Sequence, residues 1–122
     1  MKSILIIDDE PPIRKLLKSL FESNNYKVIE AANGFEGLKA FQAHHPELVI
    51  TDLIMPEKEG LETIREMKAL KRDVKIIAMS GGGVSDPGIY LDFAKKFGAQ
   101  KAFSKPVDND ELLAAVNSLL VD

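Results

Sequence analysis

Five short apolar runs along the chain alternate with longer segments in which apolar residues recur at helical spacing. Such runs are typical of buried strands, and such segments are typical of amphipathic helices. The predicted strands are residues 3–7, 27–31, 48–51, 75–79 and 101–104. Because strands alternate with helices from end to end, the pattern predicts an α/β protein whose parallel sheet is covered by helices on both faces.

The predicted helices begin at residues that suit a helix N-terminus. Proline is tolerated in the first turn, and a side-chain oxygen followed three residues later by Glu caps the exposed N–H groups. These start signals are Pro11-Pro12, Asn33 with Glu36, Asp86-Pro87, and Asp108 with Glu111. Gly60 introduces the third helix, and Gly98 ends the fourth. In the second helix, Phe35, Leu38 and Phe41 are expected to form the buried face. The result is five strand–helix units without a linker, which predicts a single domain over residues 1–122.

Polar residues that could take part in catalysis or ligand binding follow four of these strands. Asp8 and Asp9 follow the first strand, Asp52 the third, Ser80 the fourth and Lys105 the fifth. Five units favour the flavodoxin-like doubly wound strand order 2-1-3-4-5 over the other common order. Open parallel sheets bind ligands beyond the carboxyl ends of their strands, and strands one and three are neighbours in this order. We therefore expect these side chains to converge on one rim.

The composition narrows the possible functions. The chain has 122 residues, 45% hydrophobic and 29% charged, which is typical of a globular domain with a real core. Its net charge of −3 and the lack of a basic stripe argue against direct binding of nucleic acid. It has no Cys, so disulfides and thiol chemistry are excluded. The apolar run after Lys2 is too short for a signal peptide or a membrane span, so we expect a cytoplasmic protein that does not bind membranes.

The converging residues suit phosphoryl transfer. Clustered carboxylates repel one another and attract a cation, and Mg²⁺ prefers oxygen ligands. A carboxylate is also a nucleophile that can carry an aspartyl-phosphate. Lys105 is placed to offset charge on the transferring group, and the Ser80 hydroxyl to donate to one of its oxygens. Each residue alone has a structural explanation, such as a solvated turn at residues 8–10 or a helix cap at Asp52. The coincidence of all four strand ends favours the functional interpretation.

Two other motifs carry little chemistry. His44 and His45 lie at the end of the second predicted helix, where a cation suits the helix dipole, and there is no other His for a transition-metal site. The run Gly81-Gly82-Gly83 lacks the Lys-Ser/Thr ending of a P-loop and the spacing of a dinucleotide fingerprint. A strand–helix connection is the better interpretation of that run.

On these residues the chain resembles the receiver domain of bacterial two-component response regulators. The resemblance spans the whole chain, and its motifs are spaced as in that family. The matching segments are Ile6-Ile7-Asp8-Asp9-Glu10, Asp52-Leu53-Ile54-Met55-Pro56 with Gly60, Met79-Ser80-Gly81, and Lys105-Pro106.

The resemblance implies a role for each matching residue. Asp52 would accept a phosphoryl group from a sensor histidine kinase or phosphotransfer protein. Asp9, Asp52 and the main-chain carbonyl of Ile54 would bind Mg²⁺, with Asp8 assisting. Ser80 would be the switch hydroxyl, and Lys105 would pair with the phosphoryl group. The resemblance also implies a Lys-Pro bond that is often cis, which is unusual on base rates.

The implied function is a phosphorylation-controlled binding module. It would assist its own phosphorylation and dephosphorylation but turn over no external substrate. A downstream protein partner would bind the face formed by the fourth helix, fifth strand and fifth helix. We expect a stand-alone or isolated receiver, because no DNA-binding effector follows the fifth helix.

One position departs from the family pattern. Three residues before the lysine, where the family usually carries Tyr or Phe, this chain has Ala102. Phe103 follows, and it should point to the opposite side of the strand. We therefore expect the signal to travel mainly through the glycine-rich connection after Ser80, which would re-dock near Tyr90.

Two rival functions make different demands on the sequence. A magnesium-dependent phosphatase of the haloacid-dehalogenase type places a second Asp two residues after its nucleophile, where this chain has Ile54. A pseudo-receiver normally loses one of the acids or the lysine, and none is lost here. Both rivals therefore fit less well than a receiver that is phosphorylated.

Overall fold

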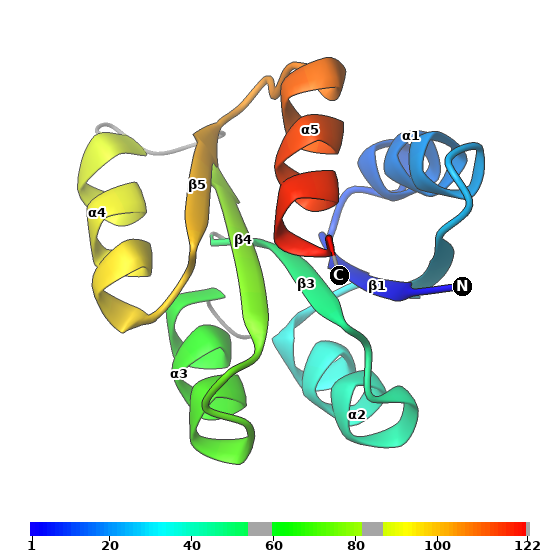
Figure 1. Ribbon diagram of the computed structural model, residues 1–122. Coiled ribbons are helices and arrows are strands. Elements are labelled where there is room, and N and C mark those ends of the chain that lie inside the picture. The colour runs from blue at the N-terminus through cyan, green and yellow to red at the C-terminus, as the bar shows by residue number, and fades with distance from the viewer. Residues whose placement is uncertain (54–59, 82–86, 122) are drawn as a thin grey trace.

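The computed structural model describes residues 1–53, 60–81 and 87–121. It contains a five-stranded parallel sheet in the order β2-β1-β3-β4-β5 with a helix after each strand (Figure 1). The elements are β1 (Ser3–Ile7), α1 (Pro11–Glu22), β2 (Lys27–Ala31), α2 (Gly34–His44), β3 (Leu48–Asp52), α3 (Gly60–Leu70), β4 (Lys75–Ser80), α4 (Pro87–Phe97), β5 (Lys101–Ser104) and α5 (Asn109–Leu119). The predicted flavodoxin-like order is confirmed, and β3 and β4 each extend one residue further than expected.

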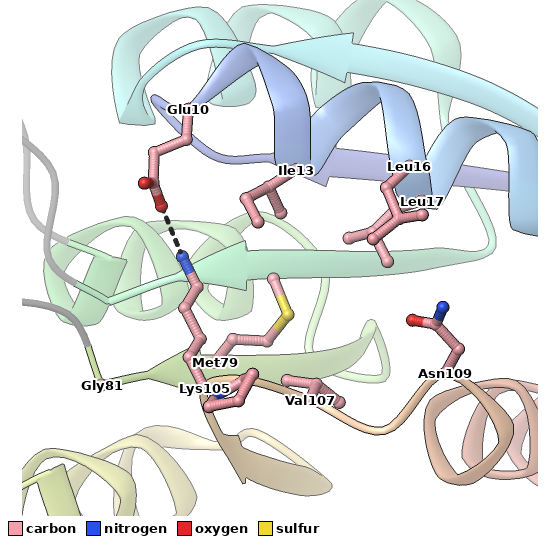
Figure 2. Close-up of a pocket in the computed structure, with 10 residues that line it drawn as sticks. Glu10, Ile13, Leu16, Leu17, Met79, Gly81, Lys105, Val107 and Asn109 are labelled. Carbon is pink, nitrogen blue, oxygen red and sulfur yellow. Dashed lines mark hydrogen bonds and ion pairs between the residues drawn. The ribbon is translucent and has the colours of Figure 1, made fainter.

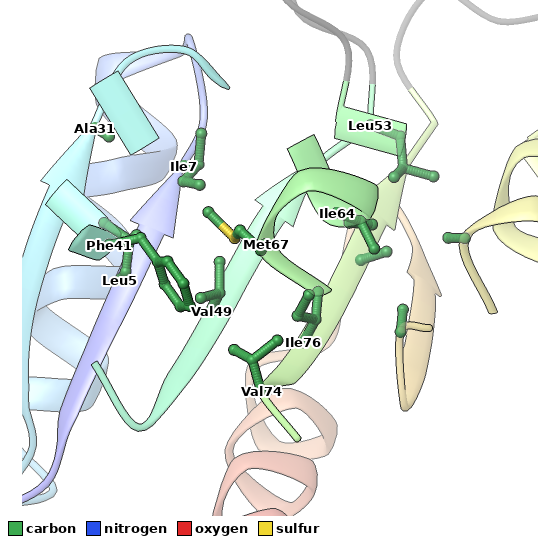
Figure 3. Close-up of a cluster of buried hydrophobic side chains, with 13 residues drawn as sticks. Leu5, Ile7, Ala31, Phe41, Val49, Leu53, Ile64, Met67, Val74 and Ile76 are labelled. Atoms are coloured by element: carbon green, nitrogen blue, oxygen red, sulfur yellow. The ribbon is translucent and has the colours of Figure 1, made fainter. Parts of the chain in front are cut away.

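The three inner strands, β1, β3 and β4, bury both of their faces, and this divides the core into two layers. Along β1, Ile4 and Ile6 pack with residues of α1 and α5, whereas Leu5 and Ile7 pack with residues of α2, α3 and α4. Figure 3 shows the second of these layers, with Met67 and Ile64 of α3 lying against the sheet. Because successive strand residues point to opposite faces, apolar residues are needed at every position of a doubly covered strand.

Two of the predicted helix starts have the expected side-chain cap, whereas Asp86, the predicted cap of α4, lies outside the described residues. The Asn33 side chain accepts a hydrogen bond from the Glu36 N–H at 2.9 Å, and Asp108 accepts one from the Glu111 N–H at 3.0 Å. Each bond satisfies an N–H group that the first turn of a helix leaves without a partner. The structure therefore confirms both predicted caps.

The expected buried face of α2 is partly wrong. Phe35 is 58% exposed, whereas Gly34, Gly37 and Phe41 face the core. The reason is steric: a Cβ built on Gly37 would lie 2.4 Å from Cδ1 of Ile7, so this glycine lets the helix approach β1 closely. That approach fixes the rotation of the helix and turns Phe35 outward.

Among the described residues, no helix is long and apolar enough to cross a membrane.

Candidate functional site

Asp8 and Asp52 meet at the carboxyl end of the sheet because β1 and β3 are neighbours. Ile7 pairs with Thr51 across the two strands, so the aspartates that follow them lie side by side. The Asp8 N–H continues the ladder by donating to the carbonyl of Ala31. Asp8 is fully buried, and Asp52 is 6% exposed. Two carboxylates at this depth require a compensating cation or hydrogen bonds.

Lys105 supplies that cation from the end of β5. Its Nζ lies 2.9 Å from Oδ2 of Asp8 and 3.0 Å from Oδ2 of Asp52. Burial of Lys105 by itself lowers its pKa. The hydrogen bond to Asp8 and the charge of Asp52 outweigh that effect, so the pKa of Lys105 is raised. The ammonium therefore stays protonated and holds the two carboxylates together.

Glu10 completes the acidic cluster. Its Oε2 lies 3.3 Å from Nζ of Lys105, and oxygens of Asp8, Glu10 and Asp52 all lie within 4.8 Å of one another. The sequence motif contained Glu10, but we assigned it no role. The chain bends at Asp9, and the Glu10 N–H donates to Oδ1 of Asp8 at 2.9 Å, which brings Glu10 to the rim. The available signal was the presence of another acid two residues after Asp8.

The remaining predicted metal ligands are placed differently. Asp9 lies between Asp8 and Glu10 with an exposed side chain and is not part of the clustered group found among the described residues. Ile54, whose carbonyl is the other predicted ligand, lies outside the described residues. The assignments of Asp9 and Ile54 to a metal stay predictions.

Ser80 lies at the end of β4, between the strands that carry Asp52 and Lys105. Its carbonyl accepts a hydrogen bond from the Lys105 N–H at 2.7 Å, which joins the two strand ends. The Ser80 side chain is fully buried, and its Oγ has no hydrogen-bond partner among the described residues. A buried hydroxyl without a partner is unfavourable by about 1–3 kcal/mol. A ligand oxygen arriving at the rim would remove that cost.

Two glycines let the backbone close around the site. A Cβ on Gly60 would lie 2.2 Å from the carbonyl oxygen of Asp52. A Cβ on Gly81 would lie 3.0 Å from N and O of Lys105. The start of α3 and the residue after β4 are therefore packed directly against the backbone of Asp52 and Lys105. The Lys105-Pro106 bond is cis, as the resemblance implied.

Ala102 and Phe103 point to opposite faces of β5, as expected. Ala102 packs against the core layer under α4, and Phe103 packs against the layer under α5. Beside Ala102, a groove of about 440 Å³ runs between β5 and α5, with Lys95 of α4 and Lys101 at its edge. Phe103 also lines this groove, so the aromatic side chain there comes from the position next to Ala102, on the α5 side of the strand.

An apolar pocket adjoins the acidic cluster. It has a volume of about 410 Å³ and is lined mainly by aliphatic side chains of α1 and of the segment between β5 and α5. Figure 2 shows Glu10 and Lys105 facing each other at one end of this pocket, with Ile13 and Leu17 further along α1. Leu16 of α1 also borders it and is half exposed.

Comparisons with known proteins agree with this architecture. The profile of the response regulator receiver domain family matches residues 4–117, so the chain belongs to that family. It is 34% identical to the sporulation initiation phosphotransferase F of Bacillus subtilis over 98% of this chain and 94% of that protein. The chain spans about half the length of several other curated relatives.

Solved structures of response regulators have the same fold as this chain. A response regulator receiver domain protein from Clostridium thermocellum superposes with a TM-score of 0.91 at 32% identity, covering 98% of this chain and 94% of that one. The response regulator TrrA from Thermotoga maritima, solved in complex with Mg²⁺-BeF, has a TM-score of 0.86 at 38% identity, covering 98% and 100%. The protein is a receiver domain of two-component phosphorelay signalling, a class of signalling module rather than a classical enzyme.

Proposed function

We propose that Asp52 is the residue that accepts the phosphoryl group, and that the donor is a histidine kinase or a phosphotransfer protein. The observation that carries this proposal is the contact of one ammonium, that of Lys105, with both Asp8 and Asp52 at the rim. Asp52 is the carboxylate at the end of the central strand β3, and it retains 6% exposure through which a donor can reach it. An oxygen of Asp52 attacks phosphorus and the P–N bond of the phosphohistidine breaks, with its electron pair left on that nitrogen. The imidazole leaves as a neutral ring that carries its proton on the other nitrogen.

Lys105 and Ser80 have complementary parts in this proposal. Lys105 neutralises the carboxylates before transfer, and the added phosphoryl group brings about −1.5 to −2 charge with new acceptor oxygens. The ammonium is then attracted to those oxygens, and the Ser80 hydroxyl donates to one of them. This gives the Ser80 hydroxyl the partner that it lacks among the described residues. Phosphorylation and a change of the β4 end are thereby linked.

The donor set fits magnesium. The clustered groups of Asp8, Glu10 and Asp52 offer only oxygen atoms, the ligand type that Mg²⁺ prefers, and Asp9 and the Ile54 carbonyl would add more. When bound, Mg²⁺ neutralises the carboxylates and the charge on the transferring phosphoryl oxygens. We keep Asp8, Asp9, Asp52 and Ile54 as the proposed ligands and add Glu10 as a candidate.

The output remains part of the proposal. We expect a protein partner at the face of α4, β5 and α5, and we expect the domain to assist its own dephosphorylation. Because Ala102 replaces the usual aromatic, the signal should pass from Ser80 through the segment that begins at Gly81. Gly82, Gly83 and the Tyr90 side chain lie outside the described residues. NMR spectra with and without beryllofluoride should show large shifts from Ser80 to residue 90 and smaller ones over 101–107. Shifts confined to the immediate neighbours of Asp8, Asp9 and Asp52 would contradict this route.

The phosphorylation itself is tested by intact mass. The protein is incubated with acetyl phosphate and Mg²⁺, and we expect a mass increase of one phosphoryl group that disappears with a chelator. Asp52→Asn should show no increase, whereas the matched control Asp92→Asn, on the exposed surface of α4, should behave like the parent. A hydroxylamine-labile phosphate on Asp52→Asn would show that the acceptor is another residue.

A further inference from the structure

The backbone carbonyl of Asp8 cannot be satisfied by the residues that directly follow it. The Asp8 N–H still donates to the carbonyl of Ala31, and the chain then leaves the sheet. In a turn or in the first turn of a helix, the Asp8 carbonyl would accept from the N–H of residue 11 or 12. Both residues are proline, which has no N–H. Because Asp8 is fully buried, its carbonyl needs a donor from elsewhere.

Arg14, one turn into α1, supplies that donor. Its Nη1 donates to the Asp8 carbonyl at 2.6 Å, the short distance of a charge-assisted hydrogen bond. The Arg14 main-chain N–H donates to the Glu10 carbonyl at 3.2 Å. One residue therefore binds the turn between Asp8 and Glu10 at two points. The Arg14 side chain is only 18% exposed, so the surrounding structure restricts its movement.

Glu30 of β2 orients the guanidinium of Arg14. Its Oε1 lies 3.5 Å from Nε of Arg14. Glu30 pairs with Ile6 of the neighbouring strand β1, so the sheet sets its position. A guanidinium is a rigid fork that can serve one partner through Nε and another through Nη1, whereas a lysine ammonium is a single point charge. The fork of Arg14 thus connects β2 to the turn that carries Asp8.

The direction of the Asp8 carboxylate is set from two sides. Its Oδ1 accepts from the Glu10 N–H at 2.9 Å, and its Oδ2 lies 2.9 Å from Nζ of Lys105. In the proposed function, the Lys105 ammonium is drawn toward the phosphoryl oxygens, so its contact with Asp8 weakens. The turn that Arg14 binds is then the main constraint on the Asp8 carboxylate.

We propose that Arg14 is a positioning residue for magnesium: by binding the Asp8 carbonyl, it holds the Asp8 carboxylate in the direction that suits the metal. This inference rests on the proposed function, in which Asp8 is one of the ligands. Arg14 itself contacts neither the metal nor the phosphoryl group. Partners that orient metal ligands in this way typically contribute about 10–100-fold to metal affinity or activity.

The sign of the effect distinguishes positioning from simple electrostatics. Removing a positive charge beside a cation site by itself favours the cation. If Arg14 acted only through its charge, Arg14→Ala would therefore bind Mg²⁺ more tightly than the parent. Positioning predicts the opposite, a weaker affinity. Arg14→Lys keeps the charge but lacks the fork, so it should also bind Mg²⁺ more weakly than the parent.

Calorimetric titration of the full chain with Mg²⁺ measures this difference without phosphorylation. Arg14→Ala should raise the Kd for Mg²⁺ about tenfold or more. The matched control Arg72→Ala, which removes an exposed arginine between α3 and β4, should leave the Kd unchanged. In phosphorylation by acetyl phosphate, Arg14→Ala should raise the Mg²⁺ concentration for half-maximal rate by a larger factor than it lowers the maximal rate.

A double-mutant cycle tests the part of Glu30. Glu30→Ala should weaken Mg²⁺ binding in the parent, but it should have little further effect when Arg14 is already alanine, because Glu30 acts through Arg14. An equal effect in both backgrounds would show that Glu30 acts by its charge alone, and it would overturn the proposed link between β2 and the turn.

The remaining outcomes separate this inference from the proposed function. Amide NMR spectra without metal verify that each variant is folded, and Arg14→Lys carries the test if Arg14→Ala does not fold. A parent that neither binds Mg²⁺ nor gains a phosphoryl group would contradict the proposed function and this inference with it. If the parent does both, and a folded Arg14 variant binds Mg²⁺ as tightly as the parent, only the positioning role is overturned. A loss of affinity in Arg72→Ala equal to that in Arg14→Ala would overturn it as well.

Discussion

The two ends of the sheet use lysine in opposite ways. At the carboxyl end, the ammonium of Lys105 contacts three carboxylates, and the Ser80 hydroxyl beside it lacks a partner among the described residues. At the other end, Lys2 and Lys75 donate to the carbonyls of Leu120 and Leu119 at the end of α5. Those carbonyls carry the negative end of the helix dipole, so the lysines stabilise a helix terminus.

The contrast separates a site from a scaffold. At the amino end of the strands, the Gln100 side chain has backbone partners: it accepts from the Ile76 N–H and donates to the Val74 carbonyl. The carboxyl end instead concentrates like charges in a buried place, which is unfavourable without a cation. Natural proteins tolerate such arrangements where activity needs them. Substitutions at the two ends of the sheet should therefore change the free energy of unfolding by different amounts and, for some pairs, in opposite directions.

The largest difference should come from glycine. In Gly60→Ala the new Cβ meets the backbone of Asp52 and Leu53 at 2.2 and 2.7 Å, and backbone has little room to move. We expect a loss of about 3 kcal/mol or more in the free energy of unfolding. In Gly98→Ala, at the other end, Cβ meets Cε of Lys68 at 2.6 Å, and the residue has a φ of 122°. Because the lysine can move aside, the cost is the backbone strain, about 1–2 kcal/mol. Equal losses in urea unfolding would contradict this.

The next largest difference in stability should be between substitutions of Lys105 and Lys75. Lys105→Met leaves the buried carboxylates of Asp8 and Asp52 without their cation, and we expect a loss of about 3 kcal/mol in buffer without metal. Lys75→Met removes a hydrogen bond to one carbonyl near solvent and should lose about 1 kcal/mol. Urea unfolding with and without Mg²⁺ is the measurement. Added Mg²⁺ should recover part of the loss for Lys105→Met by binding the native state, and it should leave Lys75→Met unchanged relative to the parent.

Replacing two serines by alanine should change the free energy of unfolding in opposite directions. Ser80→Ala removes a buried hydroxyl that has no hydrogen-bond partner in the described part of the chain, so the free energy of unfolding should stay the same or rise by up to about 1 kcal/mol. Ser3→Ala, at the other end of the sheet, removes a hydroxyl that donates to Oε2 of Glu47 at 2.7 Å. That variant should lose about 0.5 kcal/mol. A clear destabilisation by Ser80→Ala would mean that its hydroxyl has a partner in solution before phosphorylation.

The smallest expected effect is the pH dependence of stability that comes from Glu47. Burial raises the pKa of Glu47, but the hydrogen bonds from the Ser3 hydroxyl and N–H outweigh it and hold the pKa below its usual value of 4.5. A lowered folded-state pKa adds stability above the unfolded value, and that stability is lost as the pH falls through the folded value. The gap between the parent and Ser3→Ala should therefore narrow below about pH 4.5, as measured by urea unfolding at several pH values. A gap that widens in acid would contradict the sign.

The sequence was informative wherever one local rule decides a structure. Asn33 and Asp108 each sit three residues before a Glu, and both cap a helix as this spacing predicts. The strand order and the meeting of Asp8, Asp52 and Lys105 followed from the topology of five alternating units. These features depend on short spacings or on the fold class as a whole.

The errors came from packing and from side-chain direction. Phe35 fits the helical period of α2, but the close approach of Gly37 to Ile7 rotates the helix and exposes it. Glu10, which had no predicted role, joins the cluster through a bend at Asp9 in which its N–H donates to Oδ1 of Asp8. Neither outcome follows from residue type or period alone, because the first depends on how closely a helix approaches a strand and the second on the local conformation of a turn.

The most direct test of the central claim locates the phosphoryl group on the chain. The protein is phosphorylated with acetyl phosphate and Mg²⁺, reduced with borohydride, which converts an aspartyl-phosphate to homoserine, and then digested and sequenced by mass spectrometry. In the parent protein, without substitutions, we predict homoserine at residue 52 alone. Homoserine at Asp8, Asp9 or any other aspartate, with residue 52 unchanged, would contradict the account.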